Sequence, residues 1–419
     1  MQKFIIHGGK KLSGAIAVKG YKNAATPIIA ATLLTNKECI IKNVPRIGDV
    51  FRMIEIMESM GVEISWLETD ALRIKAERVN PEKMDFKAVS RMRSSILLLG
   101  PLLARCGKFK MPQPGGCVIG ARPIGSHFTA LEKLGAKITK ENGFYCFEAK
   151  KLEGKEIVLP EFSVTATENL MMAASLAPGI TVIKIAALEP QVQDLQKFLK
   201  KMGAKIKFGN FNTVIIKGVK KLHGATYTVI PDLIEAGTFA IAAVATKSEL
   251  IIKNVIRDHL DLVFDKLAEM GAKFEFDGDN VKIDPVSMLV SAKIEARIFP
   301  GLPSDLQAPF GVLATQAQGT SLIHDTLYEG RLGYVNELNK MGANAIICDP
   351  HRALISGPTQ LYGSEITSFD LRAGATMIIA ALVAQGESVI SNIEQIDRGY
   401  ENIEERLKNI GADITRMEI

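Results

Sequence analysis

The sequence predicts an α/β protein of six related units, arranged as two groups of three. The first observation behind this prediction is a short phrase that occurs six times: a large apolar residue, a glycine and a small apolar residue. Its copies are Met60-Gly61-Val62, Leu134-Gly135-Ala136, Met202-Gly203-Ala204, Met270-Gly271-Ala272, Met341-Gly342-Ala343 and Ile410-Gly411-Ala412. The glycines lie 68 to 74 residues apart along the whole chain, and such a regular period indicates one structural unit repeated six times.

The second observation is a stretch nearly free of charge at the start of every unit. These stretches are residues 23–34, 94–104, 165–177, 234–246, 306–317 and 373–384. They are rich in Ala, Leu, Ile and Met, and Glu168 and Glu235 are their only charged residues. A helix that is apolar on all sides belongs in a protein core, so we expect six buried helices.

The rest of each unit follows one order, which the third unit illustrates. A β-branched strand is expected at residues 181–184, followed by a loop and an amphipathic helix. The apolar positions of that helix recur at i, i+3, i+4 and i+7, and they are Leu195, Phe198, Leu199 and Met202. The glycine of the repeated phrase closes the helix as its C-cap, and a further strand is expected at residues 205–208. Six such units predict two groups that meet near residues 227–232, with the ligand site in a cleft between them.

Composition and charge exclude several classes of protein. The net charge of +5 is mild and there is no basic run, so we expect no nucleic-acid partner. No apolar run approaches the ~18–20 residues that cross a bilayer, and residues 1–7 are typical of a first strand and not of a signal peptide. The five scattered cysteines form no zinc-binding pattern. These observations favour a cytoplasmic protein that acts on small molecules, with neither a membrane segment nor a metal.

Polar and charged residues stand where the buried helices begin. They are Lys22 and Asn23, Arg91 and Arg93, Ser163 and Thr165, Asp232, Ser304 and Asp305, and Asp370 and Arg372. Helix N-termini attract anions, and Ser163, Asp232, Ser304 and Asp370 could also be simple N-caps. A cation at this position opposes the helix dipole, so Lys22, Arg93 and Arg372 predict an anionic partner.

Three arginines lie beside glycine in the strand-to-helix loops of the second, fifth and sixth units: Arg122, Arg331 and Arg398. The planar guanidinium group binds carboxylates and phosphates through two hydrogen bonds. A single loop arginine is usually only solvated. Three at equivalent positions, together with the cations at the helix starts, predict a strongly anionic substrate.

Cys117 is the candidate for covalent or proton-transfer chemistry. It follows two glycines, and Arg122 nearby would favour its thiolate. The only histidine close in sequence is His127, so a cysteine-protease pair is not supported. The other four cysteines (Cys39, Cys106, Cys146 and Cys348) lie in or beside apolar stretches and are interpreted as inert. Asp305 is the best candidate for a base that accepts a hydroxyl proton.

Five segments together resemble one known enzyme family. They are PGGCVIGARP at 114–123, GYKNAA at 20–25, PSDLQ at 303–307, DLRA at 370–373 and DRGYE at 397–401. They resemble the UDP-N-acetylglucosamine 1-carboxyvinyltransferases, and the resemblance runs from about Phe4 to Thr415. The sister family, the 3-phosphoshikimate 1-carboxyvinyltransferases, shares the fold but lacks the cysteine loop.

The resemblance implies a fold and a reaction. The fold is the enolpyruvyl transferase fold of two inside-out, α/β-barrel-like domains with three units each, at residues 22–229 and at residues 1–21 with 230–419. The reaction transfers the enolpyruvyl group of phosphoenolpyruvate to the 3-hydroxyl of UDP-N-acetylglucosamine and releases phosphate. It would be the first committed step of peptidoglycan synthesis, in the cytoplasm, and would need neither cofactor nor metal.

The resemblance also implies roles for individual residues. Cys117 would protonate C3 of phosphoenolpyruvate from a loop that closes over the sugar nucleotide, and Asp305 would accept the sugar hydroxyl proton. Lys22, Arg122 and Arg398 would bind the phosphate, with Lys22 and Arg398 also catalytic, and Arg331 and Arg372 would bind the carboxylate. Asn23 would contact both substrates. The sugar-nucleotide site would comprise Asn23, Arg93, Arg122, Pro123, Ile124, Gly125, Ser126, Ser163, Val164, Thr165, Asp305 and Leu327.

The chain departs from the family pattern at four positions. Gly125 stands where aspartate is usual and Leu233 where arginine is usual, and Gly48 and Glu161 lack the common basic residue. These positions concern the lid and the uridine phosphate contacts. Two alternatives therefore stay open: an enolpyruvyl transferase with another acceptor, and a paralogue that binds the sugar nucleotide without turnover. A binder needs no acid, so the presence of Cys117 and Asp305 together favours the enzyme.

Overall fold

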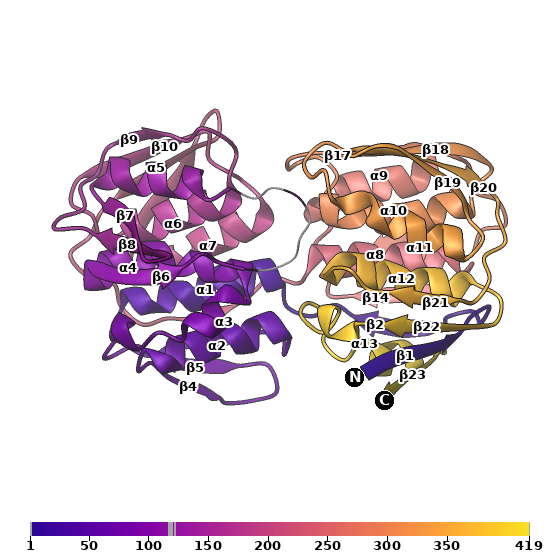
Figure 1. Cartoon of the computed structure of the whole chain (residues 1–419), viewed down its shortest axis with the longest axis horizontal. Coiled ribbons are helices and arrows are strands. Elements are labelled where there is room, and N and C mark those ends of the chain that lie inside the picture. The colour runs from indigo at the N-terminus through magenta and orange to yellow at the C-terminus, as the bar shows by residue number, and fades with distance from the viewer. Residues whose placement is uncertain (1, 116–119, 121–122, 419) are drawn as a thin grey trace. The chain divides into compact units, whose positions relative to one another are not determined.

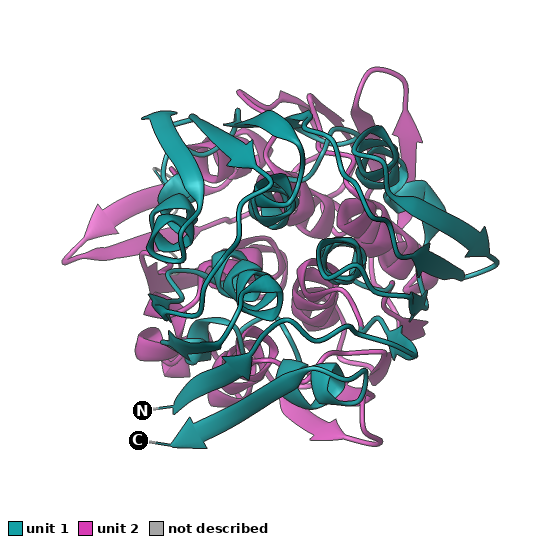
Figure 2. Ribbon diagram, turned by 90° about the vertical axis from the view of Figure 1, so that its right-hand side faces the viewer, with its two compact units in different colours: residues 1–19, 117–121, 231–419 teal, residues 20–116, 122–230 magenta. Residues whose placement is uncertain are grey.

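The computed structural model describes residues 2–115, 120 and 123–418. They divide into two compact units, which Figure 2 distinguishes by colour. Unit 1 contains residues 2–19, 120 and 231–418, and unit 2 contains residues 20–115 and 123–230. Cys117 and Arg122 lie outside the described residues.

The charge-poor stretches form helices at the centre of each unit, as predicted. In unit 1 they are α8 (Leu233–Ala245), α10 (Ser304–Thr315) and α12 (Leu371–Val383), which pack against one another. In unit 2 they are α1 (Lys22–Ala31) continuing into η1 (Thr32–Leu34), η3 (Arg93–Leu98) continuing into α4 (Leu99–Cys106), and α6 (Val164–Ala174). Every residue of α8 is buried, as its composition predicts. Figure 2 shows the three helices of unit 1 enclosed by strands, which is the inside-out arrangement.

Small sheets surround these helices in both units. The described residues of unit 1 form sheets with the orders β15-β16-β14-β2, β17-β18-β20-β19 and β21-β22-β1-β23. Their strands are β1 (Gln2–His7), β2 (Ala15–Ala17), β14 (Leu250–Lys253), β15 (Lys273–Asp277), β16 (Asn280–Asp284), β17 (Lys293–Ala296), β18 (Gly319–Asp325), β19 (Asn344–Asp349), β20 (Arg352–Gly357), β21 (Glu365–Thr367), β22 (Glu387–Ser391) and β23 (Asp413–Glu418).

The described residues of unit 2 form sheets with the orders β13-β3-β5-β4, β6-β8-β7 and β11-β12-β10-β9. Their strands are β3 (Cys39–Lys42), β4 (Glu63–Trp66), β5 (Leu72–Lys75), β6 (Lys108–Pro112), β7 (Lys137–Glu141), β8 (Phe144–Glu148), β9 (Glu156–Val158), β10 (Ile180–Lys184), β11 (Lys205–Gly209), β12 (Thr213–Lys217) and β13 (Thr226–Thr228). The second strand of each hairpin, such as β12 after β11, is an element that the sequence analysis did not identify.

The amphipathic helices complete the repeat. They are α2 (Gly48–Ser59), α5 (Gly125–Leu134), α7 (Pro190–Lys201), α9 (Asp261–Glu269), α11 (Tyr334–Lys340) and α13 (Ile403–Lys408). The glycine of the repeated phrase follows each of them with φ between 92° and 115°. That backbone conformation is unfavourable for residues with a Cβ atom, which explains why glycine recurs there. The shorter helical segments are η2 (Pro81–Lys83), α3 (Phe86–Ser90), η4 (Arg257–His259), η5 (Arg331–Gly333) and η6 (Ile393–Gln395).

The N-terminal strand completes the last repeat. β1 pairs antiparallel with both β22 and β23. In the five other repeats the equivalent place is taken by the second strand of a hairpin, such as β16 between β15 and β14. The beginning and the end of the chain therefore form one sheet in unit 1.

One predicted helix was wrong in its form. Residues 94–104 were expected to form a single α-helix, but the chain forms the 3-10 helix η3 as far as Leu98 and an α-helix only from Leu99. Although α1 and α10 accommodate Pro27 and Pro309 further inside, Pro101 lies in the first turn of α4, where proline is tolerated. Gly100 beside it lets α4 approach α6 closely: a Cβ atom there would lie 2.3 Å from the carbonyl oxygen of Asn169.

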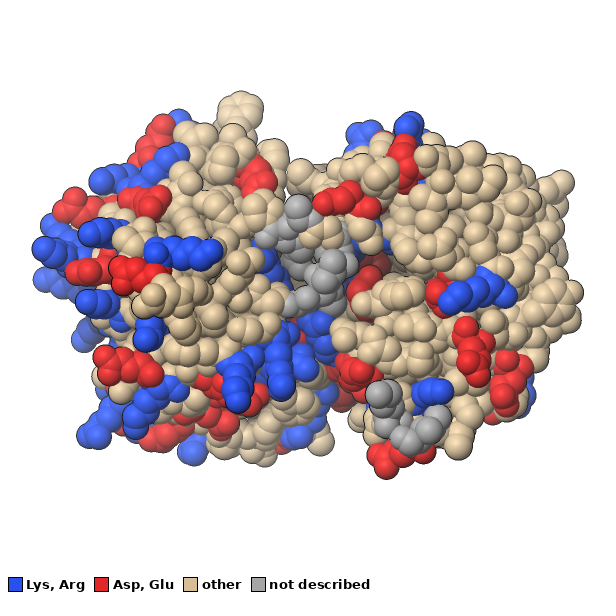
Figure 3. All heavy atoms as spheres, in the orientation of Figure 1, with Lys and Arg blue, Asp and Glu red and all other residues tan. Residues whose placement is uncertain are grey.

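Charge is distributed differently on the visible faces of the two units. Figure 3 shows lysine and arginine side chains interspersed with acidic ones on unit 2, whereas unit 1 is largely uncharged over β18 to β20. Among the described residues, no helix combines the length and the apolar character that a membrane span requires.

Candidate functional site

Asp305 is held by two arginines at the beginning of α10. It is the second residue of that helix. Arg331 Nη1 lies 2.5 Å from Asp305 Oδ1, and Arg372 Nε lies 3.3 Å from Asp305 Oδ2. The side chains of Arg331 and Arg372 are only 12% and 4% exposed, so this interaction is poorly screened by water. The sequence analysis singled out all three residues, and the structure brings them together.

Arg372 is fixed by the beginning of α12. Asp370 is the N-cap of that helix, and its Oδ1 accepts hydrogen bonds from the backbone N–H groups of Arg372 and Ala373 at 2.7 and 2.9 Å. The Arg372 guanidinium also pairs with Asp232 at 3.5 Å and lies 5.1 Å from the ring centroid of Tyr400. Burial raises the pKa of Asp232, and the charge of Arg372 opposes that rise. The anionic partner predicted for Arg372 is therefore supplied, within unit 1, by carboxylates of the protein.

Arg331 has a second set of contacts. Its Nη1 also donates to the hydroxyl of Ser304 at 3.2 Å, and its guanidinium lies 4.9 Å from the ring centroid of Tyr328. Burial acts to lower the pKa of Arg331, but the carboxylates of Asp305 and Asp370 outweigh it, and the pKa lies above the ordinary arginine value. Its Nε is buried and has no hydrogen-bond partner among the described residues. Arg331 is thus a permanent cation with a donor available for an additional acceptor.

Two further predicted residues of unit 1 lie in ordered turns. Arg398 is 8% exposed, and its Nη1 donates to Gln395 Oε1 at 3.0 Å. Leu327 follows β18, and its backbone N–H donates to Asp325 Oδ1 at 2.9 Å. Both turns connect a strand to the helix that follows it, where the sequence analysis expected the binding loops.

Lys22 is paired with an aspartate of its own unit. It is the first residue of α1, and its Nζ lies 2.8 Å from Oδ2 of Asp49, the second residue of α2. Asn23 beside it donates from its Nδ2 to the Tyr21 hydroxyl at 3.3 Å. A protein carboxylate therefore offsets the cation at the beginning of α1. Asp49 was missed by the sequence analysis, although it is an acidic residue in the first turn of an amphipathic helix.

Several predicted sugar-nucleotide residues of unit 2 lie where α5 and α6 begin, whereas Asn23 is on α1 and Arg93 begins η3. Ser163 is the N-cap of α6, and its hydroxyl accepts from the Ala166 N–H at 3.4 Å. Thr165 Oγ1 lies 2.7 Å from Nε2 of His127 on α5. The hydroxyl of Ser126 is buried and has no hydrogen-bond partner among the described residues. Val164 and Gly125 are the first residues of these two helices, so two helix N-termini lie close together here. Such an arrangement favours a phosphate-bearing ligand.

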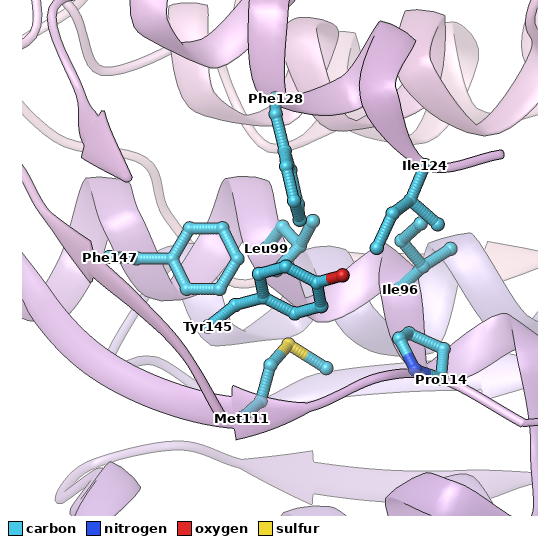
Figure 4. Close-up of a pocket in the computed structure, with 8 residues that line it drawn as sticks. All are labelled: Ile96, Leu99, Met111, Pro114, Ile124, Phe128, Tyr145 and Phe147. Carbon is cyan, nitrogen blue, oxygen red and sulfur yellow. The ribbon is translucent and has the colours of Figure 1, made fainter. Parts of the chain in front are cut away.

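The segment before α5 is attached to the unit 2 core. Arg93 Nη2 donates to the Pro123 carbonyl at 3.5 Å. Ile124 lines a small apolar pocket, shown in Figure 4, whose space does not admit a water molecule. The pocket is lined by Ile96, Leu99, Met111, Pro114, Ile124, Phe128, Tyr145 and Phe147. Pro114 is the first residue of the PGGCVIGARP segment and Ile124 follows its last residue. Both line this pocket, which is too apolar for an anionic substrate.

Two interpretations from the sequence need correction. Ser304 was a candidate N-cap, but Pro303 occupies that position and the Ser304 hydroxyl donates instead to Asp325 Oδ2 at 2.5 Å. Cys348 was expected in or beside an apolar stretch, but it is exposed on β19, as is Ile346 of the same strand, so it is not part of the core. That it is inert stays a prediction. Among the described residues, no group of three or more His, Cys, Asp or Glu side chains is arranged to hold a metal ion.

Comparison with known proteins identifies the family of this chain. The chain matches the family model of EPSP synthase (3-phosphoshikimate 1-carboxyvinyltransferase) over residues 6–407. It is 44% identical over 421 residues to the UDP-N-acetylglucosamine 1-carboxyvinyltransferase of Koribacter versatilis (strain Ellin345), covering 100% of this chain and 97% of the relative. It is also 44% identical over 426 residues to the enzyme of the same name from Treponema denticola, covering 100% of both chains.

Solved structures show the same fold. The enolpyruvyl transferase NikO from Streptomyces tendae matches with a TM-score of 0.90 and 26% identity, over 99% of this chain and 98% of that chain. An EPSP synthase from Acinetobacter baumannii matches with a TM-score of 0.74 over 100% of both chains, and at 21% identity it supports the fold alone. Because the similarity in sequence extends over the whole length, this chain belongs to the UDP-N-acetylglucosamine 1-carboxyvinyltransferase family.

Proposed function

We propose that this protein transfers the enolpyruvyl group of phosphoenolpyruvate to the 3-hydroxyl of UDP-N-acetylglucosamine and releases phosphate. The names of its full-length relatives support the acceptor and the reaction. The observation that carries the proposal is the Asp305 carboxylate between Arg331 and Arg372. It combines a candidate base with two preorganised cations, which an addition to a doubly anionic enol phosphate requires.

The proposed chemistry is an addition followed by an elimination. The sugar hydroxyl loses its proton to Asp305 and attacks C2 of phosphoenolpyruvate, while Cys117 delivers a proton to C3. The tetrahedral adduct then loses a proton from C3 and expels phosphate, which leaves the enolpyruvyl ether on the sugar. Lys22, Arg122 and Arg398 would bind the phosphate, as the resemblance implies.

The ion pairs of Asp305 add a physical step to this scheme. A carboxylate with an arginine on each oxygen is a weak base, because the cations stabilise its charged form. The carboxylate of phosphoenolpyruvate has the same charge and shape as that of Asp305. We propose that it competes for Arg331 and Arg372 and releases Asp305 to accept the hydroxyl proton. The base would then become active only when the second substrate is bound.

The proposed place of the reaction is the cytoplasm, at the first committed step of peptidoglycan synthesis. The test is phosphate release from phosphoenolpyruvate with and without UDP-N-acetylglucosamine, with UDP-glucose and shikimate 3-phosphate as acceptor controls. Release that depends on UDP-N-acetylglucosamine is the expected result. Release with another acceptor would assign a different transferase activity. The absence of release with any acceptor, together with binding of the sugar nucleotide, would identify a non-catalytic paralogue.

A further inference from the structure

Asp325 is a buried carboxylate whose two oxygens serve different parts of unit 1. It is the last residue of β18 and is fully buried. Its Oδ1 accepts hydrogen bonds from the backbone N–H groups of Leu327 and Tyr328 at 2.9 and 3.0 Å. Its Oδ2 accepts the hydroxyl proton of Ser304 at 2.5 Å. One side chain therefore connects the turn after β18 with the beginning of α10.

The Ser304 contact continues to Arg331. A serine hydroxyl has one proton and two lone pairs. Because the proton points to Asp325, the lone pairs face Arg331, whose Nη1 donates to Ser304 Oγ at 3.2 Å. The same nitrogen lies 2.5 Å from Asp305 Oδ1. Asp325 thus orients the hydroxyl as an acceptor for the arginine that binds the candidate base.

The turn held by Asp325 leads to the same arginine. The Tyr328 N–H is held by Asp325 Oδ1, and the Tyr328 ring lies 4.9 Å from the guanidinium carbon of Arg331. The backbone of Asp325 is itself fixed by His351: Asp325 N–H donates to the His351 carbonyl at 2.9 Å, and the Asp325 carbonyl lies 2.7 Å from His351 Nδ1. Arg331 is therefore supported at two points, and both depend on a carboxylate anchored in the sheet.

We propose that Asp325 is the positioning residue for Arg331, acting through Ser304 and the Tyr328 turn. It would not touch substrate. It would hold the guanidinium at the place where Arg331 binds both Asp305 and, on the proposed function above, the carboxylate of phosphoenolpyruvate. Loss of Asp325 would let the Ser304 hydroxyl rotate and let the turn relax, so Arg331 would no longer be preorganised.

The kinetic test is a double-mutant cycle with Ser304→Ala and Asp325→Asn. Loss of a hydrogen bond to a charged group weakens binding by about tenfold. We therefore expect each variant to raise the KM for phosphoenolpyruvate by about tenfold. The KM for UDP-N-acetylglucosamine should change less in Ser304→Ala, because Ser304 does not touch the Leu327 turn. The double variant should resemble Asp325→Asn alone, because both changes interrupt one chain of contacts.

The matched control is Asp85→Asn. Like Asp325, Asp85 accepts from the N–H groups two and three residues further along, here Lys87 at 2.8 Å and Ala88 at 3.1 Å, but it lies in unit 2 as the N-cap of α3. We expect it to change the KM for phosphoenolpyruvate by less than about twofold, because these hydrogen bonds involve none of Asp325, Ser304 and Arg331. An unchanged KM in Ser304→Ala, additive effects in the cycle, or an equal rise in the control would each overturn the proposal.

Crystal structures of the two variants separate this proposal from the proposed function. If the wild-type protein releases no phosphate, the function fails, but the position of Arg331 still tests Asp325. Displacement of the Arg331 guanidinium from Asp305 in Asp325→Asn or in Ser304→Ala supports the proposal. The proposal is overturned, whatever the activity, if the Arg331 guanidinium stays within hydrogen-bond distance of Asp305 in Ser304→Ala. The same must then hold in Asp325→Asn wherever that variant folds.

Discussion

The ammonium of Lys22 lies 2.8 Å from the carboxylate of Asp49, and the two side chains are only 12% and 2% exposed. Lys22 stands at a helix N-terminus, where a positive charge is unfavourable, and Asp49 stands at another, where a negative charge is favourable. The pair therefore lets unit 2 keep a lysine at the beginning of a buried helix.

Asp49→Asn should destabilise the protein by about 2 kcal/mol, because it leaves the Lys22 charge largely buried without its partner. Denaturant unfolding measures the change. The control is Glu156→Gln, which breaks the Lys184–Glu156 pair of the same unit; that pair is 2.7 Å long but 45% and 59% exposed. The control substitution should lower the free energy of unfolding by about 0.5 kcal/mol or less. Equal effects of the two substitutions would show that burial of the Lys22 pair has no energetic importance.

Asp305→Asn should reduce turnover by a factor of about 100 to 10,000, because the amide cannot accept the hydroxyl proton. It should also weaken folding, since Arg331 and Arg372 lose the charge that both contact. Initial rates of phosphate release and the melting temperature measure the two effects. Binding of UDP-N-acetylglucosamine by calorimetry provides the control for a folded site. A variant within tenfold of the wild-type rate would remove Asp305 from the role of base.

Glu168→Gln should stabilise the protein more at pH 8 than at pH 5. Glu168 is 1% exposed, and its Oε1 has no hydrogen-bond partner among the described residues. Burial raises its pKa well above the ordinary value, and the nearby Glu189 adds to the rise. Above the pKa of the unfolded chain, the folded state therefore binds more protons than the unfolded state, so the free energy of unfolding falls as pH rises. Glutamine does not ionise, so Glu168→Gln removes this fall in the free energy of unfolding.

Urea unfolding of Glu168→Gln and wild type at the two pH values measures this difference. Glu153→Gln supplies the control: a hydrogen bond from Lys151 lowers the pKa of Glu153, so its ionised form is stabilising at both pH values and the effect of this substitution should be the same at pH 5 and pH 8. A Glu168→Gln difference that is constant with pH, or that shrinks as pH rises, would contradict the raised pKa.

Arg416→Lys should raise the KM for phosphoenolpyruvate roughly fivefold, because lysine cannot reproduce paired hydrogen bonds. Arg416 on β23 binds both oxygens of Asp397 at 2.9 and 2.7 Å and both oxygens of Glu404 at 2.6 and 3.1 Å. It thus holds both ends of the segment that carries Arg398. Steady-state kinetics give the measurement. Lys10→Met, which removes an exposed pair with Asp413, is the control. The same small change in both variants would mean that Arg416 does not support Arg398.

Cys117→Ser should lose most turnover yet still bind the sugar nucleotide, and Cys117→Asp should keep part of the activity, because a carboxyl group can also act as an acid. The aspartate variant should resist epoxides that alkylate thiols. Residual activity after epoxide treatment measures resistance, and Cys348→Ala, which removes an exposed thiol, should stay as sensitive as the parent. Equal inactivation of Cys117→Asp and the parent would exclude Cys117 as the alkylated group.

The periodic features of the fold could be predicted from the sequence. The charge-poor helices such as α8 and the glycines that end the amphipathic helices follow from local composition and backbone preference. The place of β1 between β22 and β23 could not be predicted from local pattern, because it joins residues about four hundred positions apart.

The site could be predicted in its residue types but not in its pairings. The sequence marked Lys22, Asp305, Arg331 and Arg372 as charged groups at helix starts and loops. It contained no signal that Asp49 would pair with Lys22, or that Asp325 would accept the Ser304 hydroxyl, since these partners come from different elements of the repeat. A buried carboxylate at the end of a strand resembles any turn aspartate until its neighbours are known.

The most direct test of the account is a phosphorus NMR time course of the wild-type protein with phosphoenolpyruvate and UDP-N-acetylglucosamine. The account predicts that phosphate and an enolpyruvyl-bearing UDP-sugar form in equal amounts, and that neither forms when the sugar nucleotide is left out. Phosphate produced without the sugar product, or phosphoenolpyruvate left intact in the presence of both substrates, would contradict it.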